Sequence, residues 1–511
     1  MSQNQKVVFK NYVTNQPFLL PPSLDELIPA HHPVRVVNSV IDQIDLSKLL
    51  KMYKGGGTSS YHPRMLLKVL VYSYLSNIYS SRKIEAGLQE NIHFMWLSGM
   101  QQPDHNTINR YRTERLKDVL KTIFGQVVQL LSKSGHLSLK EIYTDGTKIE
   151  ANANRYTFVW GNSVKHNRHK MEDQLRELWA YSQDVAAEEL KDTDPIDFKE
   201  ISPEELQKTV EEIHQVLKKK DQVPPKVKQK LNYIKREWSN NLSKYQEHEV
   251  ILGQRKSYSK TDRDATFMRM KEDHMKNGQL KPGYNLQVSS NNQYIVNYSI
   301  HQNPTDTKTL SSHLLSFQKL YNKSPESIVA DAGYGSQENY ELLEKGKINA
   351  FIKYNSFDKE QRKRFLKDNF KSEYFVHDKE TDTLFCPAGK PLHPLKNITR
   401  KSKSGYLQTY TTYKAINCKG CELRDKCHQS KLNRKVELNH KLKDYKIKVN
   451  ELLKSEIGIY HRKKRAYDVE PVFANIKHNK KFKRFNLRGI KKVEIETGLI
   501  ALAHNLKKMA A

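Results

Sequence analysis

The chain has 511 residues, too many for one compact core, so roughly two to four domains are expected. It carries 87 Lys and Arg against 57 Asp and Glu, a formal net charge of +30. Such an excess indicates a polyanionic partner, most often nucleic acid, although a merely soluble basic protein is the alternative. The four cysteines exclude a disulfide scaffold, and no run approaches the ~20 apolar residues of a membrane span, so we expect a cytoplasmic protein without membrane contact.

The N-terminal part divides by composition into an arm and a helical region. Residues 1–60 are expected to form an N-terminal arm that ends in the Gly/Ser-rich stretch "KGGGTSSYHP" at 54–63. Residues 61–135 repeat apolar side chains at three- and four-residue spacing, which predicts a helical domain.

Two short helices in this region are compatible with DNA binding. The stretches "SSRKIEAGLQEN" and "PDHNTINRYRTERL" are separated by a turn region that contains Gly99 and Pro103. The second helix is basic through Arg110 and Arg112, which suits a DNA groove or backbone. A solvated basic face on a small helical bundle accounts for the same pattern equally well.

Two segments end an apolar run in an aspartate. "LSLKEIYTDGTKIEANANRY" reaches Asp145, and "SIVADAGYGSQENY" reaches Asp331 after a run typical of a strand covered on both faces. If the two strands are parallel neighbours, both carboxylates emerge at the same edge of the sheet, whereas a turn-forming Asp is the alternative at position 331. Two close carboxylates repel each other, and a divalent cation removes that repulsion. Mg²⁺ suits such a site because it prefers oxygen ligands.

The segments between these aspartates predict a helical insertion followed by a hairpin. Residues 165–251 are highly charged and helical, with a capping box at Ser202. "GYNLQVSS" and "QYIVNYSI" then alternate with a period of two around "SNNQ", which predicts a hairpin with one buried face. We interpret Asp306, after the hairpin, as a helix cap rather than a fourth acid. The aspartate strands and the hairpin fall in an α/β core over 136–164 and 252–360.

Five phrases carry a resemblance to a known family. In chain order they are "YTDGTKIEANANRY", "SKTDRDATF", "PGYNLQV", "VADAGYGSQENYELLE" and "VEPVFANIKHN". Together they resemble the DDE transposases of bacterial insertion sequences, in the group numbered eleven-eighty-two, over nearly the whole chain. The resemblance implies an α/β fold in which an RNase H-like mixed sheet with helices is interrupted by the helical insertion and by a Cys-containing insertion. An all-α N-terminal domain precedes it.

The resemblance also implies the metal ligands. Asp145 and Asp331 are the first two ligands, Glu470 is the third, and the cofactor is a pair of Mg²⁺ (or Mn²⁺) ions. Glu470 and Lys477 stand as Glu-x6-Lys, and seven residues is nearly two helical turns, so both are expected on one side of a helix. Glu470 would hold metal and Lys477 would contact a DNA phosphate. An exposed Glu and Lys on an ordinary amphipathic helix are the alternative.

The surroundings of Glu470 depart from the pattern of the class. The class has Arg four residues before the Glu and Tyr three residues before that Arg, and here these positions are Ala466 and Lys463. We assign no catalytic role to the neighbouring Arg465. Pro471 directly follows Glu470, which predicts that a helix starts or is kinked there.

A Cys-containing insertion, residues 361–445, follows the second aspartate. The x2 spacing of two of its cysteines fits a zinc knuckle, and four thiolates would close a structural tetrahedral Zn²⁺ site. His428 or His393 could replace a cysteine, and ordinary reduced cysteines in a loop are the alternative. The candidate zinc ligands are Cys386, Cys418, Cys421 and Cys427.

The C-terminal helices, residues 446–511, carry the third acid and the stretch "KHNKKFKRFNLRGIKK". Its basic residues with interleaved aromatics suit contacts with DNA phosphates and bases, whereas solvated basic surface is the alternative. The candidate DNA contacts of the whole chain are Arg110, Arg112, Lys477, Lys480, Lys481 and Arg484.

Taken together, these features predict a transposase that binds the ends of its insertion sequence, cuts them in a metal-dependent reaction and joins them to target DNA. Both element ends must be brought together, so a homodimer on DNA is expected. The alternatives are a structure-specific nuclease of the same fold and a non-catalytic DNA-binding protein derived from a transposase.

Overall fold

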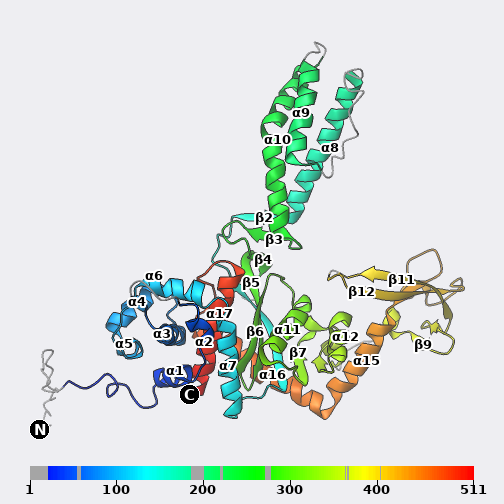
Figure 1. Ribbon diagram of the computed structural model, residues 1–511. Helices are drawn as coiled ribbons and strands as arrows, with labels where there is room; N and C mark the ends of the chain where they lie inside the picture. The colour runs from blue at the N-terminus through cyan, green and yellow to red at the C-terminus, as the bar shows by residue number, and fades with distance from the viewer. Residues whose placement is uncertain are drawn as a thin grey trace, which may run out of the picture. The chain divides into compact units, whose positions relative to one another are not determined.

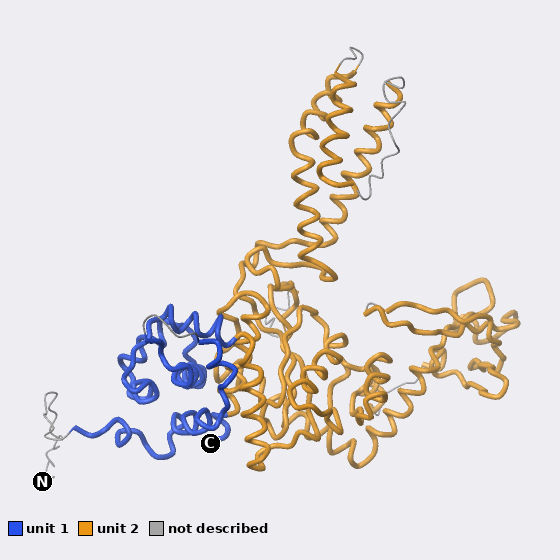
Figure 2. The backbone as a smooth tube through the Cα atoms, viewed as in Figure 1, with its two compact units in different colours: residues 1–116, 506–511 blue, residues 117–505 orange. Residues whose placement is uncertain are grey.

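The computed structural model describes residues 21–53, 59–185, 201–218, 223–270, 278–362, 364, 368–402 and 404–511. Its chain forms two compact units, shown in Figure 2: residues 1–116 with 506–511, and residues 117–505. Much of the expected N-terminal arm and part of the Gly/Ser-rich stretch at 54–63 lie outside the described residues. The boundary after Leu116 places the helix Leu120–Lys133 (α7) in unit 2, although its sequence pattern had grouped it with the N-terminal helices.

Unit 1 is helical in its described part. Its helices are α1 (Pro33–Asp42), α2 (Ser47–Leu50), α3 (Pro63–Leu75), α4 (Ser81–Glu90), α5 (Ile92–Ser98), α6 (His105–Arg110) and the π-helical η1 (Tyr111–Arg115). The sequence had placed a turn region where α5 lies. Phe94 of α5 packs edge-on against Tyr72 of α3, which anchors the short helix, and Gly99 ends it at φ +58.

A six-stranded mixed sheet forms the centre of unit 2 (Figure 1). The order is β4 (Thr266–Arg269), β5 (Leu280–Asn291), β1 (Glu141–Glu150), β7 (Ser327–Ala330) and β8 (Asn349–Ile352), and β6 (Tyr294–His301) also pairs with β5. The pairs β1–β7 and β7–β8 are parallel, whereas β5 is antiparallel to β1, β4 and β6. The sheet therefore changes from antiparallel to parallel at β1.

The first aspartate strand is longer than its sequence suggested. We expected the strand to end at Asp145, but β1 runs on to Glu150. The reason is its antiparallel partner: β5 pairs with β1 from Tyr143 to Glu150, so the backbone hydrogen bonds continue after β7 has ended at Ala330. Asp145 is thus inside its strand, and Asp331 directly follows its own.

The β5–β6 hairpin has two covered faces, not the one that we expected. Asn292 and Gln293 make its tight turn, with φ of +51 and +64. All residues of β5 from Pro282 onward are buried, including the polar positions of the alternating pattern. These polar side chains do not face solvent, because they bond to other parts of the core; Ser289 Oγ, for example, lies 2.8 Å from His313 Nε2 of α11 (Leu310–Tyr321).

The helix that carries the expected third acid is docked on the turn of this hairpin. Helix α16 (Glu456–Ala474) continues through Pro471, so no helix starts there. Proline cannot donate to the carbonyl four residues earlier, and that carbonyl, Tyr467 O, accepts a hydrogen bond from Gln293 Nε2 at 2.9 Å. The buried Asp468 carboxylate accepts from Ser290 Oγ at 2.6 Å, Asn292 N at 2.8 Å and Gln293 N at 3.2 Å.

The helical insertion consists of α8 (Gly161–Val185), α9 (Pro203–Lys218) and α10 (Pro225–Leu252), which lie side by side in Figure 1. They share a hydrophobic core of their own, with Leu175, Ile213 and Ile234 almost fully buried. The expected capping box is present, because Ser202 and Glu205 exchange hydrogen bonds of 2.9 and 3.1 Å. The short pair β2 (Phe158–Trp160) and β3 (Ser257–Ser259) stands at the base of this insertion.

The Cys-containing insertion forms a separate antiparallel sheet. Its order is β13 (Lys435–Leu438), β12 (Leu407–Ala415), β11 (Pro391–Lys401), β10 (Thr383–Phe385) and β9 (Val376–Asp378). The remaining elements of unit 2 are η2 (Asp306–Lys308), η3 (Ala332–Tyr334), α12 (Gln337–Lys345), α13 (Phe357–Glu360), η4 (Ser372–Tyr374), α14 (Arg424–Cys427), α15 (His440–Lys454) and η5 (Asn475–Asn479), together with most of α17 (Ile490–Met509). Among the described residues, no helix has the length and apolar character that crossing a bilayer requires.

Candidate active site

Two aspartates stand level with each other on neighbouring parallel strands. The register pairs Glu141 with Ser327 and Tyr143 with Val329. Continued by two residues, it brings Asp145 level with Asp331. Asp145 is only 6% exposed, and Asp331 is half-buried at the end of its strand.

Each of these carboxylates is held by a nearby backbone N–H. Asp145 Oδ1 accepts from Gly146 N at 2.7 Å, and Asp331 Oδ1 accepts from Gly333 N at 2.9 Å. Asp331 is therefore the N-cap of η3, and its Oδ1 makes the hydrogen bond expected of a turn-forming aspartate. Its Oδ2 accepts no hydrogen bond from the described residues, which leaves that oxygen available to a ligand. Gly333 is exposed, and the site opens to solvent beside it.

An arginine connects the first acid to the expected third one. Arg465 Nη2 lies 3.0 Å from Asp145 Oδ2, and its Nη1 lies 3.5 Å from Glu470 Oε1. The Arg465 side chain is 17% exposed, whereas that of Glu470 is 57% exposed. Sequence reasoning missed Arg465 because it looked for the arginine at a fixed offset of four residues. A long guanidinium side chain reaches the same place from the next position.

Several charged groups of the site act on the pKa of one buried tyrosine, Tyr334. Burial raises the pKa of Tyr334 well above its ordinary value, and the carboxylates of Asp306, Asp145 and Asp331 raise it further, against the opposing charge of Arg465. The Tyr334 hydroxyl donates a hydrogen bond to Gln287 Oε1. Three aspartates and one arginine therefore act on the same hydroxyl, and Asp306 is among them.

The side chains of this site fit a divalent cation of the Mg²⁺ class. Carboxylate oxygens are the ligands that Mg²⁺ prefers, and few protein carboxylates are needed because water and phosphate complete the coordination. Asp331 keeps one oxygen without a partner among the described residues, and the exposed Glu470 contacts the same Arg465 as Asp145 does. Arg465 neutralises Asp145 in this structure, a task that a cation would take over.

In the basic segment after α16, some of the charged side chains are exposed and both phenylalanine rings are buried. Lys481 and Arg484 are exposed, whereas Phe482 and Phe485 are 1% and 2% exposed and pack edge-on against each other. The expected stacking of these aromatics on DNA bases is therefore wrong for this fold, because the rings form part of the core. Arg484 also holds the end of β1, with its Nε donating to Ala151 O at 3.2 Å.

Three of the candidate DNA contacts are buried. Lys477 lies in the π-helical η5 at 7% exposure, and Lys480 is 0% exposed. Lys477 is buried although Glu470 is exposed. The chain changes from α-helical to π-helical geometry after Ala474, so the angle between side chains seven residues apart is not that of an α-helix. In unit 1, Arg112 is 3% exposed and donates to Tyr79 O at 2.8 Å, while Arg110 is exposed at the end of α6.

Two segments of the chain match protein-family models. Residues 22–114 match the family described as "Transposase domain (DUF772)", and residues 385–510 match "Transposase DDE domain". Over these two segments the chain is similar to transposase domains, one of them of the DDE type. The comparison with curated proteins found no match, and the comparison with solved structures found none either.

One of the two transposase matches contains residues of the candidate active site. The DDE segment contains Glu470 and Arg465, and the N-terminal match lies within unit 1. Asp145 and Asp331 lie between the matched segments, so their assignment depends on their place in the sheet.

The DDE-matched segment also contains the four cysteines, which come together in the fold. Cys386, Cys418, Cys421 and Cys427 line one small cavity of about 20 Å³, and His428 lies beside them. Burial raises the pKa of the Cys427 thiol, whereas the Arg434 guanidinium, 3.3 Å from its Sγ, acts in the opposite direction. The backbone N–H of Arg434 lies 3.4 Å from Cys418 Sγ. Four thiols around one cavity are the donor set of a structural zinc site.

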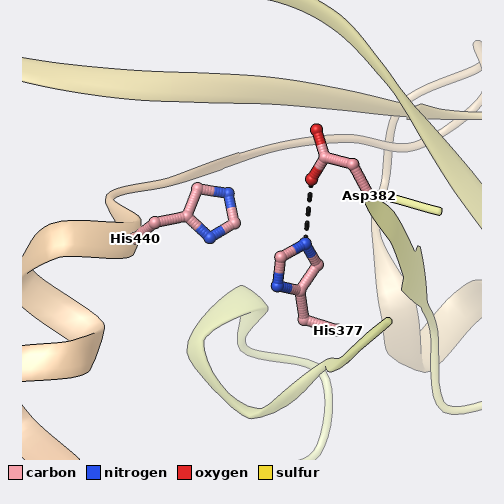
Figure 3. Close-up of side chains that lie close together, drawn as sticks. All are labelled: His377, Asp382 and His440. Carbon is pink, nitrogen blue, oxygen red and sulfur yellow. Dashed lines mark hydrogen bonds and ion pairs between the residues drawn. The ribbon is translucent and has the colours of Figure 1, made fainter. Parts of the chain in front are cut away.

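A second cluster in the same insertion combines two imidazoles and a carboxylate. His377, Asp382 and His440 bring their nitrogen and oxygen atoms within 4.8 Å of one another, and Figure 3 shows His377 Nε2 bonded to Asp382 Oδ1 at 2.9 Å. The Tyr413 hydroxyl lies 2.5 Å from Asp382 Oδ1 and 2.7 Å from His440 Nε2. Because this hydroxyl already satisfies the carboxylate and one imidazole, the cluster joins the β9–β10 turn to the start of α15 without needing an ion.

Proposed function

We propose that this protein is a transposase that binds the ends of its insertion sequence, cuts them and joins them to target DNA. The observation that carries the proposal is the position of Asp145, which lies level with one expected acid and shares an arginine with the other. Asp145 and Asp331 come level on neighbouring strands, and Arg465 links Asp145 to Glu470. The two family matches support the class, and the five phrases that resemble the group numbered eleven-eighty-two support the finer placement.

We infer that the central sheet of unit 2 is an RNase H-like catalytic core. Its support is the order of strands, in which a long antiparallel hairpin (β5–β6) pairs with β1 and two short parallel strands follow on the other side. The helical insertion and the Cys-containing insertion interrupt this core without contributing strands to its sheet. Chemistry at the ends of parallel strands is a common arrangement in α/β proteins.

In this proposal Asp145, Asp331 and Glu470 hold the Mg²⁺ or Mn²⁺ ions. Such ions, when bound, neutralise phosphate oxygens and activate the attacking hydroxyl. The protein itself positions the reacting groups and supplies fixed charge, with no covalent nucleophile from the chain. Arg465 keeps Asp145 and Glu470 together before the ions arrive, and afterwards its guanidinium is placed to meet a DNA phosphate.

DNA binding is assigned to candidate basic residues that are exposed. Lys481 and Arg484 follow the helix of Glu470 and present their charges to solvent, and Arg110 does so on α6 of unit 1. The formal charge of +30 supports a polyanionic partner for the whole chain. Arg112, Lys477 and Lys480 are left out of this interface because they are buried. A homodimer is proposed because two element ends must be joined in one reaction.

The decisive experiment is a joining assay with the full chain. The substrate is duplex DNA that carries the sequences flanking the gene at its two ends, with Mg²⁺ and a target plasmid. Asp145→Asn, Asp331→Asn and Glu470→Gln are each expected to lower joining by about a hundredfold or more. Asp358→Asn, an exposed acid on α13, is the matched control and should leave joining unchanged. Full joining by Asp331→Asn would overturn the proposal, and cleavage without joined products would replace it with a nuclease function.

A further inference from the structure

Asp306 lies among the acids of the candidate active site, although it is not one of the expected three. We interpreted it from the sequence as a helix cap, and that interpretation is wrong. The N-cap of α11 is Thr309, which makes no side-chain capping bond, and the Asp306 carboxylate accepts its hydrogen bonds from two side chains of β5 instead. Its side chain is half-buried, at the start of η2.

One oxygen of this carboxylate is fixed by two amides. Asn285 Nδ2 and Gln287 Nε2 both donate to Asp306 Oδ1, each at 2.8 Å. Gln287 is itself held, because its Oε1 accepts from the Tyr334 hydroxyl and its Nε2 also reaches Asn285 Oδ1 at 3.0 Å. The other oxygen, Asp306 Oδ2, accepts no hydrogen bond from the described residues. The two amides therefore orient the carboxylate and leave one oxygen without a partner.

Distances from two glycine positions locate the Asp306 carboxylate. A Cβ atom added to Gly146, the residue after Asp145, would lie 2.5 Å from Asp306 Oδ1. A Cβ atom added to Gly333 would lie 3.0 Å from Asp331 Oδ1 and 3.8 Å from Asp306 Oδ2. Oxygens of Asp306 and Asp331 thus border the same small volume, on the solvent-exposed side of the site. Asp306 fills the space between the chain after β7 and the chain beside Asp145.

We propose that Asp306 is a fourth carboxylate of the metal site and that its Oδ2 binds the same divalent cation as Asp331. The inference rests on the proposed function, since it adds a ligand to that site. Carboxylates gathered this closely repel one another, and two neutral amides offset only part of that repulsion. A Mg²⁺ or Mn²⁺ ion between Asp306 and Asp331 removes it, and oxygen ligands are those that such ions prefer.

The test measures metal binding by the full chain without DNA. Mn²⁺ is titrated, and the free ion is followed by its electron paramagnetic resonance signal. Asp306→Asn keeps the size of the side chain and removes its charge, and we expect Mn²⁺ binding to weaken about five- to tenfold. Asp331→Asn is the reference for a ligand of the site. Asp444→Asn, which removes one exposed acid from α15, is the matched control and should bind Mn²⁺ as the parent chain does.

The outcomes separate this inference from the proposed function. Weaker Mn²⁺ binding by Asp331→Asn with parental binding by Asp306→Asn overturns the inference and leaves the proposed function standing. Parental binding by both variants overturns the two together. A second measurement needs no substitution: Fe²⁺ with ascorbate and peroxide cuts the backbone next to a bound ion. Cuts near residue 331 without cuts near residue 306 contradict the inference, because an ion between the two carboxylates lies beside both segments.

Discussion

The guanidinium of Arg465 lies 3.0 Å from the carboxylate of Asp145, so the first acid of the site carries a positive partner before any metal is bound. A cation entering the site meets this charge. At an effective dielectric constant of about 20, two like unit charges about 4 Å apart repel by about 4 kcal/mol before solvent screening. We therefore expect Arg465→Gln to lower the Mn²⁺ concentration for half-saturation several-fold, measured by calorimetric titration of the DNA-free chain.

Lys463→Gln provides the control for this change. It removes the same charge from α16 at an exposed position, so only the long-range field of the protein changes. If the two variants bind Mn²⁺ equally, or if Arg465→Gln binds it more weakly than the parent, the contact between Arg465 and Asp145 does not oppose the cation.

Asp468 fixes the helix of Glu470 on the β5–β6 turn. Its buried carboxylate accepts from Ser290 Oγ, Asn292 N and Gln293 N, and Asp468→Ala would leave these donors without their acceptor. Ser290 is buried, whereas Asn292 is exposed and Gln293 is half-buried, so water can replace the carboxylate at the two backbone donors. A buried donor left unsatisfied costs about 1–3 kcal/mol, and we expect the free energy of unfolding to fall by about that amount. Urea unfolding of the full chain followed by Trp fluorescence measures this loss.

The matched control for Asp468→Ala is Asp444→Ala, because Asp444 is exposed on α15 and its removal leaves no buried donor. An equal, small change in both variants would show that α16 is held mainly by its apolar contacts. Asp468→Asn retains one acceptor oxygen, and its loss of stability should lie between those of the control and Asp468→Ala.

Local patterns singled out Asp145 and Asp331, because an apolar run followed by an acid is a signal within ten residues of sequence, although only Asp331 follows the end of its strand. The same patterns could not place Asp306, whose partners Asn285 and Gln287 lie about twenty residues earlier on another element. A polar residue beside a helix is most simply interpreted as its cap. Only the folded chain brings the Asn285 and Gln287 amides of β5 within hydrogen-bond distance of the Asp306 carboxylate.

The sequence also did not show which charged residues are buried. Lys480 and Lys481 are neighbours of the same type, yet one is 0% exposed and the other is on the surface. Composition predicts that a basic segment contacts solvent or DNA. Phe482 and Phe485 alternate with basic residues because the two rings pack into the core. The segment pairs with the end of β1, through Glu150 N donating to Lys483 O at 3.1 Å and Phe485 N donating to Glu150 O at 2.9 Å, and its two rings are buried.

Two histidines, His301 at the end of β6 and His313 on α11, make unit 2 sensitive to acid. Burial lowers the pKa of His301 to about 4, with Lys121 adding to the effect and Asp306 opposing it, and burial lowers the pKa of His313 well below its usual value. Both rings bond to Ser299 Oγ, at 2.7 Å each. The unfolded chain takes up protons on these histidines near pH 6.5, whereas the folded chain does not until the pH is much lower. Stability is therefore lost as the pH falls from about 6.5 toward 4, by at most about 1.4 kcal/mol per pH unit for each histidine.

The check is the midpoint of thermal unfolding at pH 7.5, 6.0 and 5.0. The parent chain should lose several degrees over this range, and His301→Gln should lose less because one of the two titrating groups is gone. His136→Gln, at a half-buried histidine between α7 and β1, serves as the comparison. A His301→Gln chain whose midpoint falls as steeply as that of the parent would assign the acid sensitivity to other groups.

The four cysteines provide the last prediction, because they line one cavity although they are spread over 386–427. We expect the purified full chain to hold one Zn²⁺ ion, and its removal by a chelator to lower the thermal midpoint of unfolding. A closed tetrahedral site contributes to folding and leaves no position for substrate. Loading with Co²⁺ should produce the intense near-ultraviolet absorption of thiolate ligands.

Substitutions decide which side chains complete the zinc site. Cys421→Ser should abolish Zn²⁺ retention, and His393→Gln, on the exposed part of β11, should not affect it. His428 is the competitor for the fourth position, because its Nε2 is buried without a hydrogen-bond partner among the described residues and it borders the same cavity. If His428→Gln releases Zn²⁺ while Cys421→Ser retains it, the site is built from three cysteines and one histidine. If neither change affects the metal content, the bound ion lies elsewhere and the cysteines are ordinary reduced thiols, since a tetrahedral site cannot lose a ligand without weakening.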